Sequence, residues 1–330
     1  MHDGIVEQAD RFKKKIASRD TSSYKVVEPG QLVVGFPIDE GVIYVQNYPY
    51  PGIMSPAYNV WDINGDLIDP AYLELVLHGP KSMAYYADKM RGTTARRRSL
   101  TADNLCAMRV PLPSLERQRR VVHLFNTVKD EMVIAGRVVE ALDQLVKSRF
   151  AEMFGDAGWP VATVGSLAVD VRYGTSKKAS DCGEYVYLRM NNMTDDGRLD
   201  LDDVKRIDLN GPELEKCRVV DGDLLFNRTN SREKVGKTVV FHEREPMVIA
   251  GYIIRVRLGD RVRPDFLATY MNLPTTKAML RSIAKGAVHQ ANINSRELSA
   301  IEVPVPPMEL QDRFLSFAAE VDKSRFVVRS

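Results

Sequence analysis

A long seam of apolar residues runs through the middle of the chain. From Val121 to Met153 these residues recur at alternating spacings of four and three, and Arg149 is the one polar residue among them. This spacing is typical of a coiled coil and predicts a continuous helix over residues 114–154. At 1.5 Å per residue the helix would be roughly 60 Å long. The seam residues expected to pack against a second helix or a partner are Val121, Phe125, Val128, Met132, Val139, Leu142 and Val146, with Phe314 and Val321 in the same phase near the end of the chain.

The alternative is an amphipathic helix that packs only on its own domain. Heptads sustained over this length are more typical of a helix with a helical partner. On both sides of the helix the pattern changes to short strands and turns. Helices are expected at 70–90 and 264–285, each opened by a proline. Alternating or β-branched runs predict strands at 32–34, 42–45, 186–188, 237–241 and 253–257.

The second half of the chain repeats the first at a shift of about 193 residues. Val-Pro-Leu-Pro-Ser-Leu-Glu-Arg-Gln at 110–118 recurs as Val-Pro-Val-Pro-Pro-Met-Glu-Leu-Gln at 303–311, and a helical pattern follows both copies. A period this long indicates duplicated domains. We therefore predict an α+β protein in which two repeated mixed α/β domains are joined by long coiled-coil helices as an antiparallel dumbbell. The expected boundaries are 1–113 for the first domain, 114–157 for the central helix, 158–306 for the second domain and 307–330 for a shorter distal helix.

Composition narrows the class of protein. A chain of 330 residues with 44% hydrophobic and 27% charged residues can bury two modest cores. No apolar run approaches the length of a membrane span and no leader pattern opens the chain, so a cytoplasmic protein is expected. The three cysteines are isolated and have no zinc-ligand spacing. Because the net charge is only +2, any nucleic-acid site must come from local clustering of polar and basic residues.

Two loops contain such clusters. In the first half, Arg96, Arg97 and Arg98 follow Gly92 and Thr93, where long cationic side chains could reach phosphates or base edges. In the second half, the loop after Phe226 is rich in the paired donors and acceptors that read bases. A polar loop can equally be an exposed turn, and that alternative stays open. The candidates here are Asn227, Arg228, Thr229, Asn230, Ser231 and Lys234, followed by Tyr173, Thr175, Ser176 and Lys177 and by His289, Gln290 and Asn292.

Several ordered motifs resemble one family, the specificity subunits of type I restriction-modification systems. The motifs are Tyr-Gly-Thr-Ser-Lys-Lys-Ala at 173–179, Leu-Arg-Met-Asn-Asn at 188–192, Gly-Asp-Leu-Leu-Phe-Asn-Arg-Thr-Asn-Ser at 222–231 and Val-Gly-Lys at 235–237. They look like one type of target recognition domain, and 24–30 looks like another. On this resemblance Arg189 and Asn191 join the DNA-binding candidates.

The resemblance implies a DNA reader without catalytic residues. Each recognition domain would contact one half of a split site on double-stranded DNA, and the paired helices would fix the separation of the halves. Modification subunits, two of them, would dock on the helices and carry the methyltransferase with its S-adenosylmethionine. Restriction subunits would join the same complex. The chain itself is expected to bind no cofactor and no metal.

The two halves are not equal, and this leaves alternatives. Residues 159–216 have almost no counterpart in the first half, so the first recognition domain is expected to be N-terminally truncated. A truncated or rearranged specificity subunit that reads only a half-site, or serves as an assembly scaffold, is therefore the alternative function. A metal-dependent nuclease could use Glu213, Glu215 and Lys216, but a surface helix in a charged sequence explains these residues better. No phosphate-binding loop, dinucleotide fingerprint or methyltransferase motif is present.

Overall fold

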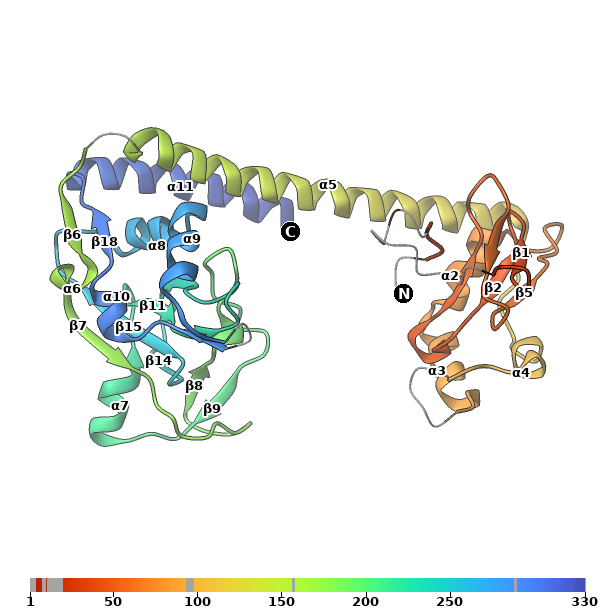
Figure 1. Ribbon diagram of the computed structural model, residues 1–330, viewed down its shortest axis with the longest axis horizontal. Helices are drawn as coiled ribbons and strands as arrows, with labels where there is room; N and C mark the ends of the chain where they lie inside the picture. Colours follow the sequence, from red (N-terminus) through yellow and green to blue (C-terminus); the bar gives the residue numbers. More distant parts are fainter. Residues whose placement is uncertain are drawn as a thin grey trace. The chain divides into compact units, whose positions relative to one another are not determined.

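The chain forms two compact units, residues 1–133 and 134–330. The computed structural model describes residues 4–7, 10, 20–92, 98–155, 158–287 and 290–329. Helices and short strands alternate in both units, which confirms the predicted mixed α+β class (Figure 1). Within the described residues no helix is both long and apolar enough to cross a membrane.

The first unit is built on small antiparallel sheets. β2 lies between β3 and β5, and β1 pairs with β4. Leu32, Val34 and Ile43 of the three-stranded sheet form a core with Tyr86 and Leu100. The strands are β1 Lys25–Val27, β2 Leu32–Val34, β3 Ile43–Val45, β4 Gly52–Met54 and β5 Asn59–Trp61, with a 3-10 turn η1 at Ile38–Glu40 and helices α2 Pro70–Leu77, α3 Pro80–Lys89 and α4 Ala102–Cys106.

The second unit has a central antiparallel sheet of order β13-β11-β15-β7. One face of this sheet packs on helix α8, and the other packs on a second sheet of order β10-β14-β8-β9, in which β14 and β8 are parallel. Alternation along β11 divides the faces, because Leu224 and Phe226 point to one core while Leu225 points to the other.

The strands of the second unit are β6 Val161–Thr163, β7 Ala168–Tyr173, β8 Tyr185–Leu188, β9 Lys205–Ile207, β10 Arg218–Val219, β11 Leu224–Asn227, β12 Thr229–Asn230, β13 Thr238–Val240, β14 Met247–Ile249, β15 Ile253–Leu258, β16 Lys285–Ala287, β17 Gln290–Asn292 and β18 Glu302–Pro304. Its shorter helices are α6 Val164–Leu167, the 3-10 turn η3 Met190–Asn192, α7 Gly211–Cys217, α8 Pro264–Asn272, α9 Pro274–Ile283 and α10 Ser295–Ser299.

Each of the two short helices predicted from sequence is in fact a pair of helices. α2 ends before Pro80, which begins α3, and α8 ends before Pro274, which begins α9. Proline has no backbone N–H and cannot continue the hydrogen bonds of the preceding helix, but it suits the first turn of a new one. The same break in both halves is a structural sign of the duplication.

The predicted continuous helix is confirmed as α5, Leu115–Phe154, and the distal helix as α11, Met308–Arg329. Within the second unit α11 runs antiparallel to the end of α5, since Phe314 contacts Phe150 while Arg325 pairs with Asp143. Val146 packs against this core, and Phe314 and Val321 are buried.

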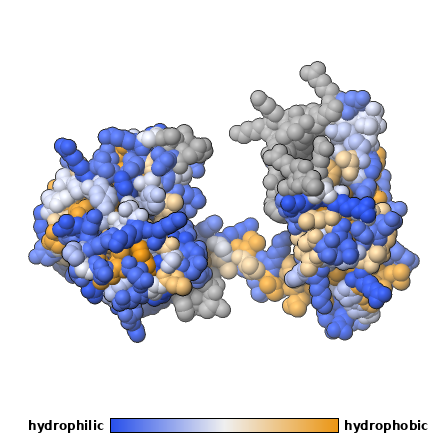
Figure 2. Space-filling model, turned by 90° about the horizontal axis from the view of Figure 1, so that it is seen from below, coloured by the Kyte–Doolittle hydropathy of each residue, from blue (hydrophilic) through white to orange (hydrophobic). Residues whose placement is uncertain are grey.

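Earlier on α5 the seam is open. Val121, Phe125, Val128 and Met132 are between 42% and 71% exposed. Apolar surface is visible along this part of the helix in Figure 2. The predicted role of these four residues in packing against a partner therefore stays a prediction.

Four phenylalanines attach the second domain to the helix pair. Phe150 and Phe154 of α5, Phe266 of α8 and Phe314 of α11 are at most 4% exposed. Their ring centroids lie 4.9 to 6.5 Å apart, mostly in tilted or edge-to-face arrangements that aromatic rings favour. Since α8 also packs on β13, the core is continuous from the central sheet to α5 and α11.

The glutamine that ends each repeated signature is a buried hydrogen-bonding hub. Gln311 accepts the backbone N–H of Arg263 (2.8 Å) and donates to the carbonyls of Arg261 (3.3 Å) and Pro306 (2.8 Å). Gln118 makes the matching bonds to Asp69 (2.8 Å), Leu67 (3.0 Å) and Pro113 (2.8 Å). Both side chains are fully buried. Each hub thus joins the first turn of a long helix to the loop that opens α2 or α8.

Candidate nucleic-acid interface

A small three-stranded sheet brings together two of the loops predicted to contact DNA. β12 pairs with β17, so that Thr229 lies opposite Asn292 and Asn230 opposite Ala291, and β17 pairs with β16. The register is extended by the Ile293 N–H, which donates to the Arg228 carbonyl (2.9 Å). Polar segments about sixty residues apart in sequence therefore share one surface.

Exposure differs among the residues of this sheet. Gln290 is exposed, whereas Asn230 and Asn292 are half-buried. Two predicted DNA contacts, Asn227 and Thr229, are buried at 0% and 8% exposure, and the side-chain oxygen Oδ1 of Asn227 accepts the backbone N–H of Thr229 (3.2 Å). Their side chains lie inside the loop, and their predicted contact with DNA stays a prediction.

Arg228 is held at the edge of the sheet by an aromatic ring. Its guanidinium carbon lies 4.9 Å from the centroid of Tyr173, and one of its terminal N–H groups donates to the Gly251 carbonyl (3.3 Å). The Tyr173 hydroxyl donates to Ser295 Oγ (2.9 Å) and accepts the Ser295 N–H (2.7 Å). A cation over an aromatic face is attracted to it, so Tyr173 restricts the orientation of Arg228. Tyr173 and Arg228, both predicted from sequence, thus meet in one place.

Buried polar atoms without a hydrogen-bond partner gather around the same sheet. Among the described residues these include Asn227 Nδ2, Arg228 Nε and Asn292 Oδ1. Buried polar groups are nearly always satisfied by protein, water or ligand, so an unsatisfied cluster needs an explanation. These atoms are themselves inaccessible to solvent, so an internal water or a rearrangement of the loop would be needed to satisfy them.

One lysine supports the neighbouring turn at 231–236 from within, and a second lies directly after it in the sequence. The Lys277 ammonium donates to the Gly236 carbonyl (2.5 Å), and burial lowers the pKa of Lys277 to about 8. Lys237, also buried, donates to the Met193 carbonyl (3.0 Å) and pairs with Asp195 (2.9 Å). Lys234 is exposed on the turn itself, and Ser231 is half-buried. The turn thus exposes two cations, Arg232 and Lys234, and one anion, Glu233, above the Lys277 ammonium.

The other predicted residues of the second unit lie in two further places. The Thr175 hydroxyl donates to Glu213 (2.7 Å) and Lys177 pairs with the same carboxylate (2.5 Å), which together lower the pKa of Glu213, the Lys177 contact being the larger cause. Glu213 is thus occupied in holding this loop to α7. Ser176 is exposed beside it. Among the described residues no group of three or more His, Cys, Asp or Glu side chains is arranged to hold a metal ion.

Arg189 is tied to a turn of its own domain. Its guanidinium donates to the carbonyl (2.8 Å) and the carboxylate (3.0 Å) of Asp203. The neighbouring Asn191 is exposed. In the first unit Arg98 pairs with Asp39, and its carbonyl accepts the Ile38 N–H (2.9 Å). Thr93, Arg96, Arg97 and His289 lie outside the described residues.

Tyr252 was not predicted as a site residue, yet the structure places it beside Arg228. Its carbonyl accepts the Arg228 N–H (2.9 Å), and it is 51% exposed. Exposed aromatic rings provide flat surfaces for nucleic-acid bases. In the sequence it stands directly before the apolar strand β15, where a tyrosine is read as part of a core.

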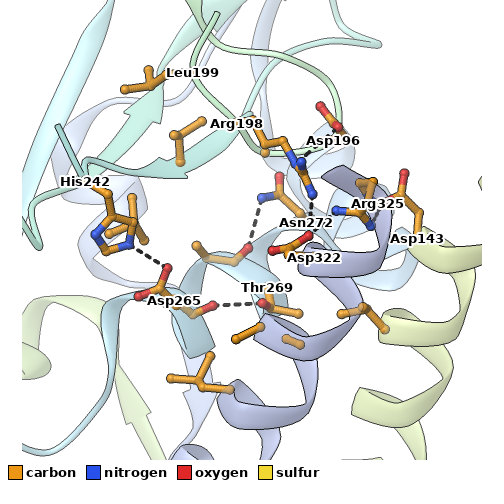
Figure 3. A pocket seen from close by; sticks show the side chains of 18 of the residues that line it. Asp143, Asp196, Arg198, Leu199, His242, Asp265, Thr269, Asn272, Asp322 and Arg325 are labelled. Carbon is orange, nitrogen blue, oxygen red and sulfur yellow. Dashed lines mark hydrogen bonds and ion pairs between the residues drawn. The ribbon is translucent and has the colours of Figure 1, made fainter. Parts of the chain in front are cut away.

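Away from this sheet, the second unit has a cleft of about 560 Å³ bounded by α5, α8, α11 and the turn at 196–199 (Figure 3). His242 lines it between two carboxylates, Asp265 (2.9 Å) and Asp221 (2.8 Å). Hydrogen bonds to these groups, chiefly to Asp265, raise the pKa of His242 to about 9.

The raised pKa predicts a pH dependence of stability. Because the folded-state pKa lies above the ordinary value of 6.5, the stabilisation by His242 is complete below pH 6.5 and is lost as the pH rises through 9. The side chain is 55% exposed, so the effect is small. The free energy of unfolding, measured at pH 6, 8 and 9.5, should decline less in His242→Gln than in the unaltered chain. His123→Gln, at an exposed histidine of α5, should decline as the unaltered chain does; equal declines in all three chains would contradict the prediction.

Comparison with known proteins gives a consistent answer, although no family model matches the chain. It is 26% identical over 168 residues to a protein named as the type I restriction enzyme MjaX specificity subunit of Methanocaldococcus jannaschii, covering 50% of this chain and 39% of that one. It is 23% identical over 223 residues to the type I restriction enzyme EcoKI specificity subunit of Escherichia coli K12, covering 61% and 48%. The chain thus spans about half the length of the curated relatives it matches.

A solved structure shares the fold. A chain from a structure described as showing complex assembly and conformational transition of the type I restriction-modification system aligns with a TM-score of 0.58 and 21% identity, over 92% of this chain and 77% of that one. In sequence this chain is similar to specificity subunits of type I restriction enzymes, and it shares its fold with a chain from a type I restriction-modification system.

Proposed function

We propose that the chain is the DNA sequence-specificity component of a type I restriction-modification complex and reads a bipartite site on double-stranded DNA. The observation that carries the proposal is the small sheet β12-β17-β16, on which Asn230, Gln290 and Asn292 lie beside Arg228. Amide and guanidinium side chains are the groups that pair bidentately with base edges. The exposed Arg232 and Lys234 of the turn at 231–236 supply positive charge for contacts to phosphates.

The remaining activities of the complex belong to partner subunits in this proposal. The chain itself is non-catalytic, and modification subunits, two of them, bring the methyltransferase and its S-adenosylmethionine. Restriction subunits join the same complex. The exposed apolar side chains of α5, among them Leu124, Phe125 and Met132, support a protein partner, because large exposed apolar patches commonly mark interaction surfaces.

The alternative, a half-site reader or assembly scaffold, predicts a different binding pattern. The site is first identified by methylation-sensitive sequencing of the host genome with and without this gene. Gel retardation by the chain with its modification subunits is then measured on duplexes carrying both half-sites, either half-site, or scrambled halves. Binding of the bipartite duplex with an affinity at least tenfold higher than that for either single half-site supports the proposal. Equal retardation of the bipartite and single-half duplexes favours the half-site reader, and equal retardation of all duplexes favours the scaffold.

One substitution tests the sheet directly. Gln290→Ala removes an exposed amide, and we expect it to weaken binding to the cognate duplex by roughly 10- to 100-fold, the equivalent of about 1–3 kcal/mol for one lost bidentate base contact. Binding to scrambled DNA should be unchanged. The matched control Gln144→Ala removes an exposed amide from α5 and should leave both affinities as they are. A parallel loss on cognate and scrambled DNA would assign Gln290 to the phosphates instead.

A further inference from the structure

A charged residue occupies the buried seam between α5 and α11. Arg325 is 4% exposed and pairs with Asp143 across the seam and with Asp322 one turn earlier on its own helix (2.5 Å). Its neighbour in the seam, Val321, is buried and apolar. A buried ion pair rarely adds net stability compared with apolar residues of the same volume, because both charges lose their hydration. Its best-attested effect is to select one geometry among several apolar packings.

The ion pairs of Arg325 continue beyond the two helices to a turn of the domain. Asp322 also accepts from Arg198 (2.6 Å), which in turn lies 3.5 Å from Asp196. Figure 3 shows these side chains converging from α5, α11 and a turn of the recognition domain. Asp143, Arg325, Asp322, Arg198 and Asp196 therefore form a chain of alternating charges, here called the charge chain, that links three segments of the second unit.

The turn that carries Arg198 is itself held in place. The Thr194 hydroxyl accepts the Arg198 N–H (2.9 Å), and the Thr194 N–H donates to the Arg198 carbonyl (2.9 Å). Gly197 has φ +81°, and a Cβ there would lie 2.7 Å from the side-chain nitrogen of Asn272 on α8. Because the turn packs closely against α8, the position of Arg198 is fixed relative to the rest of the domain.

The charge chain and the four packed phenylalanines lie at different positions along the axes of α5 and α11. Phe314 and Arg325 are eleven residues apart on α11, which at 1.5 Å per residue is roughly 16 Å. Near Phe314 the domain is attached by apolar packing and by the Gln311 hub. An attachment at one height alone would let the domain tilt against the helices, whereas a second attachment farther along the pair prevents it.

We propose that Arg198 and Arg325 are positioning residues that fix the tilt of the second domain against the spacer helices, and hence the direction in which its DNA-contacting sheet faces. The inference rests on the proposed function for its consequence on DNA, but the fixed tilt does not depend on DNA. In a bipartite reader the tilt would set which half-site spacing is accepted, so the charge chain would act on specificity through geometry and without touching a base.

The first test measures the tilt in the full-length chain without DNA. Spin labels are placed at Gln144→Cys on α5 and at Glu245→Cys, an exposed residue of the domain, after Cys106→Ser and Cys182→Ser remove the exposed thiols. We expect one narrow label-to-label distance distribution in the otherwise unaltered chain and one at least about twice as wide in Arg325→Met and Arg198→Met. Arg198→Lys, which keeps the charge, should restore the narrow distribution.

Matched variants separate positioning from stability. Lys323→Met removes an exposed cation from the same helix and should keep the narrow distribution. Arg325→Met alone leaves the Asp143 charge in the seam and should lower the melting temperature, whereas Arg325→Met combined with Asp143→Asn removes both charges and should melt within a few degrees of the unaltered chain. Arg198 lies on a partly exposed turn, so if Arg325→Met fails to fold, the test is made with Arg198→Met only. Narrow distributions in folded Arg198→Met and Arg325→Met would overturn the proposal.

The second test uses cognate duplexes whose gap between half-sites is one base pair shorter or longer. The unaltered chain with its modification subunits should prefer the native gap, and Arg198→Met should reduce that preference by about tenfold. Widened distances with an unreduced gap preference would overturn the consequence for specificity. If no chain distinguishes cognate from scrambled duplexes while the distances still widen, the proposed function fails and the fixed tilt stands.

Discussion

Gln311→Ala is expected to lower the free energy of unfolding of the second unit by about 3 kcal/mol. The substitution leaves the Arg263 N–H and the carbonyls of Arg261 and Pro306 without their partner in a buried site. Each buried group left unsatisfied costs about 1–3 kcal/mol, and water entering the small cavity offsets part of the sum. Urea unfolding followed by the fluorescence of Trp159, in a Trp61→Phe background, reports on the second unit alone.

Two companion variants sharpen the result. Gln311→Glu has the same shape but cannot donate to the two carbonyls and buries a charge, so it should destabilise at least as much as alanine. Glu309→Ala alters an exposed residue of the same signature and should cost less than about 1 kcal/mol, the value of a favourable charge at a helix N-terminus. If Gln311→Ala lowers the free energy of unfolding no more than Glu309→Ala does, the hydrogen bonds of Gln311 do not stabilise the second unit.

Phe150→Ala is expected to destabilise the second unit by about 3–5 kcal/mol, the range typical of a large aromatic side chain removed from a packed core. Phe150 contacts Phe154, Phe266 and Phe314, and it is 3% exposed. Its loss should also loosen the attachment of the domain to α5, because the ring lies where α5, α8 and α11 meet. The same urea titration measures the first effect, and hydrogen exchange of the amides of α11 measures the second.

The same helix provides the control for this prediction. Phe125→Ala makes an identical change at a position that is 53% exposed, and the free energy of unfolding should move by less than about 0.5 kcal/mol. Similar losses at both positions would mean that Phe125 is covered in solution. That outcome would point to a helical or protein partner on the open seam of α5.

Sequence reasoning was accurate for the features that depend on local pattern. The heptad seam predicted α5 to within one residue, and the strand β2 was predicted over its full observed range. The proline break inside each pair of short helices was missed, although Pro80 and Pro274 signal it plainly. The relation to type I specificity subunits was also reached from ordered motifs, which the comparisons confirm.

For the candidate site the sequence was informative only in part. It named Asn230 and Gln290 as possible DNA contacts, and these stay predictions. It also named Asn227 and Thr229, which are buried. The identity of a polar residue in a loop does not reveal whether its side chain points into the core. Tyr252 was overlooked for the opposite reason, since its neighbours in the sequence are core residues while its ring is exposed.

The sequence by itself determined the duplication, the mixed α+β class, the long helix and the family of relatives, because periodicity and ordered motifs are properties of neighbouring residues. Tertiary structure alone decided what the repeated signature does. Gln118 and Gln311 look like surface residues of a helix start until the folded chain buries them as hubs. Arg325 likewise reads as a flaw in the heptad seam, and only the approach of Asp143 and Arg198 from distant segments makes it part of a charge chain. The long-range ion pairs of the charge chain join residues 124 and 182 positions apart, and the hubs reach across about fifty, so no local pattern encodes them.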